Sequence, residues 1–361
     1  MSEDPELVQQ REELKRQLAA GEYETLVDVI LNGTSRLIQK LFRSPKPPPF
    51  WYSAVVISLT ALLIDFSVSF ILGELNPQRR EVIWIDITGA VYIFLLIIVL
   101  KLGIGILFTA LRDHLVDTIE SVTDLADLQR WLSVFCNVKQ NLFFSLMWAS
   151  ALLLYSPLIF APIGFVGFGV SVLLAILAFW FGVVGYLFLV LLIMISRLSR
   201  YQLKLYTADP SSSEVIGRLS DMLAGFAFIW AVGTALIILV ITFSGLLSLP
   251  SILLNLVSGW VVLILFFAVY QFALAKAITN AKWKSLNEIQ LQIEKLKAEE
   301  SIAGKETMET INRLMDYHDR VKATRNSVLN LRAGLSFFNT LLIPLLAFIL
   351  ANLDKVLDMF S

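Results

Sequence analysis

Charged residues are scarce in this sequence. Asp, Glu, Lys and Arg make up only 16% of its 361 residues, whereas 57% are hydrophobic. Soluble domains carry about 25% charged residues, so this composition argues against a soluble protein. The net charge of −1 also argues against a nucleic-acid partner, because proteins that bind nucleic acid present a basic surface to the phosphates.

Cysteine and histidine are nearly absent. The single cysteine, Cys136, excludes a disulfide within the chain and a zinc site built from cysteines. The two histidines, His114 and His318, are far apart in the sequence. The sequence has no P-loop, GxSxG, HExxH or glycine-rich dinucleotide motif. We therefore expect no enzymatic activity, no cofactor and no metal site.

The hydrophobic residues gather in long uncharged runs. About 20 apolar residues in a helix cross the ~30 Å hydrocarbon core of a bilayer. We therefore predict an all-α polytopic membrane protein embedded in the lipid bilayer, with about seven membrane helices. The predicted segments are 52–73, 84–111, 141–160, 164–196, 222–247, 252–275 and 334–352.

The distribution of Lys and Arg predicts the orientation. Both residue types cluster before the first segment, between the second and third, between the fourth and fifth, and after the sixth. By the positive-inside rule these stretches are cytoplasmic, in a plasma or inner membrane. The N-terminus is then cytoplasmic and the C-terminus lies on the opposite side, unless Pro344 makes the last segment a re-entrant hairpin.

The polar stretches divide the chain into four parts. Residues 1–49 form cytoplasmic helices, with breaks expected at Gly21 and at Asn32-Gly33, followed by a proline-rich linker. Residues 50–275 form a six-helix transmembrane domain that includes a cytoplasmic amphipathic helix over 112–130. Residues 276–332 form a long cytoplasmic helical hairpin, and 333–361 form the C-terminal membrane segment.

Two charged residues lie deep inside predicted membrane segments. Asp65 is in the first and Lys101 is in the second. Counted from the cytoplasmic ends of two neighbouring antiparallel helices, their depths differ by about 3 Å. An unpaired charge at mid-bilayer costs about 2.5–3.5 kcal/mol, so we predict that Asp65 and Lys101 form an ion pair. The pair either serves an ion path or proton-coupled switch, or simply fixes how the two helices dock. Alternatively, Lys101 extends its side chain towards the cytoplasmic interface.

The predicted helix over 112–130 carries a regular row of carboxylates. Their spacings of 4, 3, 4 and 3 residues place them on one face of a helix. The row has three alternative roles: collecting divalent cations, docking the basic segment 197–204, or forming a solvated face. Its members are Asp113, Asp117, Glu120, Asp124 and Asp127.

The predicted hairpin has an apolar seam on each arm. Leu286, Ile289, Ile293 and Leu296 follow the 3,4,3 spacing of a coiled coil. In the second arm His318 and Arg325 occupy seam positions. Polar residues at such positions set register or oligomeric state at a cost in stability, so we expect the hairpin to drive homo-oligomerisation.

These features favour an oligomeric channel or gated pore with a cytoplasmic coiled-coil-like assembly or gating domain. One alternative is a secondary transporter that uses Asp65 and Lys101 as coupling groups. Another is a membrane-anchored sensor or scaffold that binds a cytosolic protein partner. In architecture alone, with no shared motif, the predicted layout resembles that of insect chemoreceptor-type ligand-gated channels.

Overall fold

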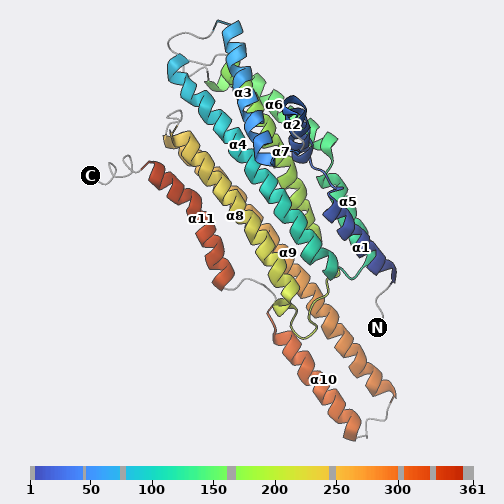
Figure 1. The fold of residues 1–361 in the computed structure, drawn as a ribbon. Coiled ribbons are helices and arrows are strands. Elements are labelled where there is room, and N and C mark those ends of the chain that lie inside the picture. The colour runs from blue at the N-terminus through green and yellow to red at the C-terminus, as the bar shows by residue number, and fades with distance from the viewer. Residues whose placement is uncertain are drawn as a thin grey trace, which may run out of the picture.

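The computed structural model describes residues 5–43, 46–73, 79–160, 168–243, 249–299, 305–325 and 331–352 (Figure 1). This part of the chain is helical, and its only β-structure is one isolated bridge. The elements are α1 (Pro5–Ala20), α2 (Leu26–Phe42), α3 (Phe50–Ile71), α4 (Arg79–Ala110), η1 (Leu111–Leu115), η2 (Val116–Thr118), α5 (Val122–Phe135), α6 (Val138–Phe160), α7 (Phe168–Leu198), η4 (Pro210–Ser212), α8 (Glu214–Phe243), α9 (Leu249–Glu299), α10 (Lys305–Ala323) and α11 (Leu331–Ala351).

The helical membrane architecture expected from the sequence is present. Five helical stretches are long and apolar enough to cross a bilayer: Phe50–Ile71, Asp86–Thr118, Ser171–Leu198, Glu214–Leu236 and Gly259–Ala298. Two shorter apolar stretches, Val138–Leu154 and Phe337–Ala351, lie in α6 and α11. Where they fall on described residues, the seven predicted segments thus each overlap an apolar helix, and five of these helices have the length and composition of a span. Positions 164–167 and 244–247 of the fourth and fifth predicted segments lie outside the described residues.

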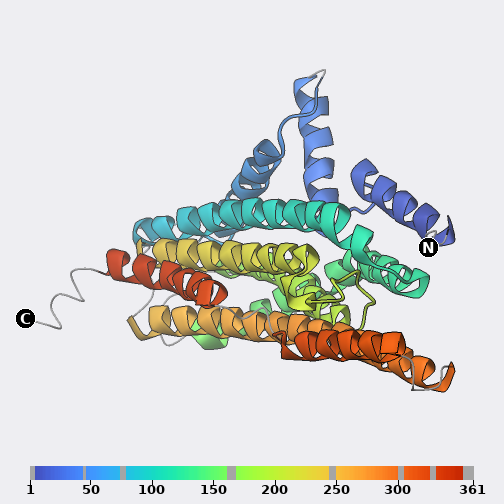
Figure 2. The ribbon, with the colours of Figure 1, turned by 90° about the horizontal axis from the view of Figure 1, so that it is seen from below.

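The long helices lie side by side. Figures 1 and 2 show α4, α7, α8 and α9 running along a common axis, with α11 beside α8. The packing of α6 on α7 depends on a glycine: a Cβ added at Gly182 would lie 2.6 Å from the Ser145 Cα. Small residues at such positions let helix backbones approach closely, which is how helices associate in lipid.

The N-terminal region forms two helices, with a break at Gly21 as predicted. Gly21 has φ +70, a left-handed conformation that glycine adopts without steric cost. Thr25 then caps α2 through a capping box with Asp28. The break predicted at Asn32-Gly33 is wrong, because α2 continues through both residues to Phe42.

The predicted helix over 112–130 is interrupted. α4 passes into the π-turn η1 and the 3-10 turn η2, and Ile119 is extended before α5 begins at Val122. Ile119 pairs with Leu203 in the isolated antiparallel bridge. Its two hydrogen bonds run from the Glu120 N–H to the Gln202 carbonyl at 2.8 Å and from the Lys204 N–H to the Thr118 carbonyl at 2.7 Å. Backbone pairing with a distant segment therefore replaces the continuous helix.

The C-terminal half of α9 extends past the other long helices and packs against α10 (Figure 1). α9 is a single helix of 51 residues. Its contact with α10 is a separate apolar cluster, to which Leu296, Leu314 and Tyr317 contribute partly buried side chains. The buried residues of the cluster are Leu286, Ile289, Ile293, Ile311 and Val321.

Candidate functional site: an apolar cavity between α4, α7 and α8

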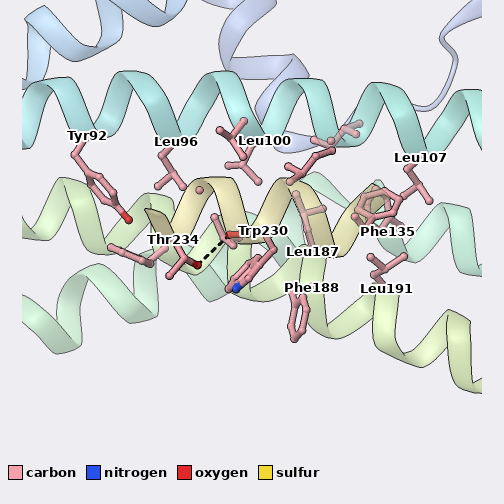
Figure 3. Close-up of a pocket in the computed structure, with 18 residues that line it drawn as sticks. Tyr92, Leu96, Leu100, Leu107, Phe135, Leu187, Phe188, Leu191, Trp230 and Thr234 are labelled. Atoms are coloured by element: carbon pink, nitrogen blue, oxygen red, sulfur yellow. Dashed lines mark hydrogen bonds between the residues drawn. The ribbon is translucent and has the colours of Figure 1, made fainter. Parts of the chain in front are cut away.

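A cavity of about 150 Å³ lies among the membrane helices (Figure 3). α4, α7 and α8 form its walls, and Phe135 of α5 contributes at one end. A cavity of this volume with apolar walls accommodates a benzene-sized molecule. The residues that line it are Tyr92, Leu96, Val99, Leu100, Gly103, Ile104, Leu107, Phe135, Phe181, Val184, Leu187, Phe188, Leu191, Phe226, Ile229, Trp230, Gly233 and Thr234.

Two glycines widen the space between α4 and α8. Gly103 of α4 faces Ile229, and Gly233 of α8 faces Val99. A Cβ at either position would lie in ordinary contact, 4.0 Å and 3.8 Å from the facing methyl groups. An alanine would therefore fit at either position without displacing a neighbour, and a larger side chain there would enter the cavity that both glycines line.

Three polar side chains interrupt the apolar wall: Tyr92, Trp230 and Thr234 (Figure 3). The Thr234 hydroxyl donates to the Trp230 carbonyl at 2.9 Å, so it is satisfied within its own helix. The Tyr92 hydroxyl and the Trp230 indole N–H are buried and have no hydrogen-bond partner among the described residues. A buried donor without an acceptor costs about 1–3 kcal/mol. Both donors therefore favour a ligand that brings an acceptor.

The polar groups of this lining are a phenol, an indole and a hydroxyl, from Tyr92, Trp230 and Thr234. The described residues that line it include no Asp, Glu, His, Lys, Arg or Cys. Tyr92 packs against Phe181 with ring centroids 5.7 Å apart, and Trp230 packs against Phe188 at 5.2 Å. These contacts fix the two donors in place, which lowers the entropy lost when a ligand binds.

The ion pair of Lys101 differs from the predicted one. Its Nζ lies 2.5 Å from Oδ1 of Asp28 in α2, on a different face of α4 from the cavity. Asp28 is about 10% exposed and Lys101 about 35% exposed. The prediction counted depths only along the membrane helices, whereas the structure brings the N-terminal α2 against α3 and α4 at the level of Lys101.

Asp65 is fully buried, as an intramembrane carboxylate should be. A second buried carboxylate, Asp86, lies in α4 within a candidate span and is also 0% exposed. The sequence reasoning passed over Asp86 because it lies close to the predicted start of its segment. The position of this carboxylate inside an apolar run of the sequence was the signal that could have identified it.

The acidic residues of the predicted row point to different partners. Asp113 pairs with its neighbour Arg112 at 2.6 Å. Asp117 pairs with Lys15 of α1 at 2.6 Å, and the hydrogen bond raises the pKa of the Lys15 ammonium. Glu120 is exposed and takes part in the bridge through its backbone. These five residues thus do not form one surface.

The last two members of the row hold the segment after α7. Asp127 accepts hydrogen bonds from Arg197 and from the Tyr201 hydroxyl, both at 2.9 Å. Asp124 accepts from the Gln202 backbone N–H at 2.7 Å. Burial, and then the bond to Asp127, raise the pKa of Tyr201. The sequence left three possible roles for the acidic row. The contacts of Asp124 and Asp127 match one of them, the docking of segment 197–204.

The two polar seam residues of the second arm lie outside the apolar cluster. His318 is partly exposed next to Asp319, and its neighbour Tyr317 packs against the cluster instead. Arg325 lies beyond the end of α10 and is exposed. The seam position predicted for Arg325 is therefore wrong, because the helix ends at Ala323. Among the described residues, no group of three His, Cys, Asp or Glu side chains could hold a metal ion.

Sequence reasoning missed Asp28 and the cavity residues Tyr92 and Trp230. The pattern Thr25-x-x-Asp28 is a capping-box signature, which marks a helix start but not a tertiary partner. Tyr92 and Trp230 stand out in their segments as aromatic residues that carry a hydrogen-bond donor. Comparisons of this chain with protein-family models, with curated proteins and with solved structures find no match.

Proposed function

We propose that this chain is a non-enzymatic membrane protein that binds a small apolar molecule in the cavity and, as a homo-oligomer, forms a pore that this ligand controls. The observation that carries the proposal is the pair of buried donors, Tyr92 and Trp230, in an otherwise apolar cavity. A few placed polar groups in an apolar pocket are typical of small-molecule sites.

The cavity defines the class of ligand. Its volume of about 150 Å³ fits a molecule near the size of benzene, and its walls favour an aromatic or aliphatic body. Each of the two donors favours a carbonyl or ether oxygen as its acceptor. Such a molecule partitions into the bilayer, so it can reach the site from the lipid.

The pore is proposed between copies of the chain, since the walls of the cavity offer no polar path for an ion. Two parts of the fold support this. α11 leaves Phe338, Leu346 and Leu350 more than half exposed. The end of α9 that packs on α10 leaves Trp283 and Leu291 exposed, at 60% and 64%. In the proposed topology these two lie in the cytoplasm, where apolar surface favours association.

The ligand site is tested with acetophenone and ethylbenzene, two aromatic molecules of similar shape of which only the first has a carbonyl. Thermal unfolding of the purified full-length chain is followed with each. We expect acetophenone to bind about tenfold more tightly, the effect of one buried hydrogen bond. Equal stabilisation by both molecules would contradict the role of the donors.

Matched variants locate the site. Tyr92→Phe together with Trp230→Phe should remove the preference for acetophenone while preserving the packing. Gly103→Leu should fill the cavity and abolish binding of both molecules. Gly105→Leu is the control, because Gly105 lies on the same helix with nothing within 4 Å of an added Cβ. Binding that survives Gly103→Leu would place the ligand elsewhere.

The pore is tested separately, through the mass of the detergent-solubilised particle and its conductance in planar bilayers. We expect three or more copies and a current that changes with acetophenone. A strict monomer overturns the pore and leaves the ligand site standing. An oligomer that binds the ligand but carries no current favours the sensor or scaffold. Solute flux that depends on Asp65 and Lys101 favours the transporter.

A further inference from the structure

The helix α2 combines an exposed apolar end with unpaired basic side chains. Leu37, Leu41 and Phe42 are 68%, 78% and 72% exposed. Arg36, Lys40 and Arg43 are also exposed, and none of the three forms an ion pair with another described residue. No acidic residue occurs between Val29 and Ile64, so no carboxylate offsets these charges locally.

α2 lies across the bundle. Figure 1 shows it nearly end-on, and Figure 2 shows α2 and the beginning of α3 standing away from the long helices of the bundle. α3 is a candidate membrane span that begins at Phe50, with the Trp51 and Tyr52 rings stacked 3.9 Å apart. Trp and Tyr are enriched at the membrane–water interface. A helix that lies across the spans at this level lies in the plane of the interface.

One side of α2 is apolar and the other is basic, which matches the hydrocarbon side and the headgroup side of the membrane interface. On a helical wheel, Leu37, Leu41 and Ile38 fall on one face, and Arg36 and Lys40 fall on the opposite one. Arg43 follows as the C-cap of the helix. A helix with this division, rich in Lys and Arg on its polar face, inserts its apolar face below the headgroups and binds anionic lipids. The Asp28–Lys101 ion pair ties its first turn to α4.

A groove joins α2 to the membrane helices. It has a volume of about 630 Å³ and lies between Ile30, Thr34 and Leu37 of α2 and apolar residues of α3, α6 and α7. A shallow depression on α2 lies next to it, lined by Gly33, Arg36, Leu37, Gln39 and Lys40. Leu37 lines both. A basic depression therefore continues into an apolar groove.

We propose that this surface is a binding site for an anionic phospholipid of the surrounding bilayer. The phosphate lies on Arg36 and Lys40, and an acyl chain lies in the groove between α2, α3, α6 and α7. Charge complementarity and the continuity of the site with a membrane span identify the occupant as lipid. The site is distinct from the ligand cavity, since none of its residues lines that cavity.

The experiment uses the full-length chain in mixed micelles that contain equal amounts of phosphatidylglycerol and phosphatidylcholine. Native mass spectrometry then counts the lipids that stay bound. Each Lys or Arg close to an anionic surface strengthens binding about fivefold. We expect the wild type to retain phosphatidylglycerol preferentially, and the variant Arg36→Gln, Lys40→Gln, Arg43→Gln to lose about 100-fold of that preference.

The control removes the same charge elsewhere. Lys284, Lys297 and Lys322 are exposed cations of α9 and α10, and their joint replacement by Gln should leave the preference unchanged. Ala149→Trp, which fills the groove, should reduce retention of both lipids. Equal retention of the two lipids by the wild type overturns the proposal. A triple variant at Arg36, Lys40 and Arg43 that behaves like the control overturns it as well.

Discussion

The two carboxylate oxygens of Asp28 hold two different elements. Oδ1 contacts the Lys101 ammonium at 2.5 Å, and Oδ2 accepts from the Thr25 backbone N–H at 3.0 Å and the Thr25 hydroxyl at 2.8 Å. The start of α2 and the middle of α4 are thereby joined through one side chain. A buried carboxylate is stable in such a place only when its oxygens are satisfied.

This ion pair predicts that substitutions of Asp28 and Lys101 have coupled effects on the free energy of unfolding. Asp28→Asn and Lys101→Met should each destabilise the protein, and the double variant should lose less than the sum. Because Lys101 is about a third exposed, we expect a coupling of about 1–3 kcal/mol, between the values for surface and buried pairs. Reversible unfolding in mixed micelles measures all four proteins.

The control repeats this comparison of four proteins with Asp65→Asn in place of Asp28→Asn. Asp65 and Lys101 should be additive, because the ion pair of Lys101 is made with Asp28. A coupling with Asp65 that exceeds the one with Asp28 would contradict the structure and restore the pair expected from the sequence.

Gly182 predicts a second stability difference. Gly182→Ala forces a Cβ against the Ser145 backbone and should cost about 1–3 kcal/mol, the range for overpacking a core. Gly185→Ala on the same helix is the matched change, since its Cβ would lie 3.5 Å from a Phe144 ring atom, an ordinary contact. The melting temperatures of the two variants measure the difference. Equal losses would show that α6 and α7 do not meet at Gly182.

The thiol of Cys136 should resist alkylation. Burial, and then the charge of Asp28, raise the pKa of Cys136 from 9.0 to about 12. At pH 8 the thiolate fraction falls about 1000-fold, and the thiolate is the reactive form. Since the folded pKa lies above the unfolded one, the associated stability is present below pH 9 and is lost as pH rises towards 12.

Iodoacetamide labelling over a pH series measures this prediction on the single cysteine of the chain. The chain unfolded in detergent provides the reference rate. Labelling of the folded protein at pH 8 as fast as that of the unfolded chain would show that Cys136 is accessible and its pKa unshifted.

Asp127 should control the pairing of segment 197–204 with residues 118–120, which precede α5. Asp127→Ala removes the contacts to Arg197 and Tyr201. We expect hydrogen exchange at the Glu120 and Lys204 amides to become about tenfold faster, because these amides form the bridge. Asp113→Ala is the control, since the Asp113 carboxylate pairs with its neighbour Arg112. Acceleration by both variants alike would indicate general loosening instead.

The positions of the membrane helices could be predicted because they depend on local composition. An apolar run such as 52–73 has few stable states in lipid other than a helix, since each backbone polar group must be satisfied within the segment. α3, at Phe50–Ile71, matches that run within two residues at either end. The apolar hairpin residues Leu286, Ile289 and Ile293 were likewise found from their spacing alone, and they pack against α10.

The contacts between distant segments could not be predicted in this way. The spacing of Asp113 to Asp127 fits one helix, yet the Glu120 and Lys204 amides gain backbone partners that no local pattern encodes. The partner of Lys101 depends on where α2 lies in the fold. Comparing residue depths along the predicted membrane segments considers only those segments, so it could not identify a partner in α2. The cavity wall includes two small residues, Gly103 and Gly233, that face larger ones on the neighbouring helix. A single sequence does not show which faces meet.

The uninterrupted length of α9 has a mechanical consequence. Its 51 residues correspond to a rod of about 77 Å at 1.5 Å per residue. Near its membrane part, the Trp260 indole donates to the Leu341 carbonyl of α11 at 3.1 Å, and farther along, Lys282 donates to the Thr324 carbonyl at 2.7 Å. A tilt of about 5° at one end would displace the other by about 7 Å. A rigid tilt of α9 among the membrane helices would therefore move its far end, and α10 with it, by several ångströms.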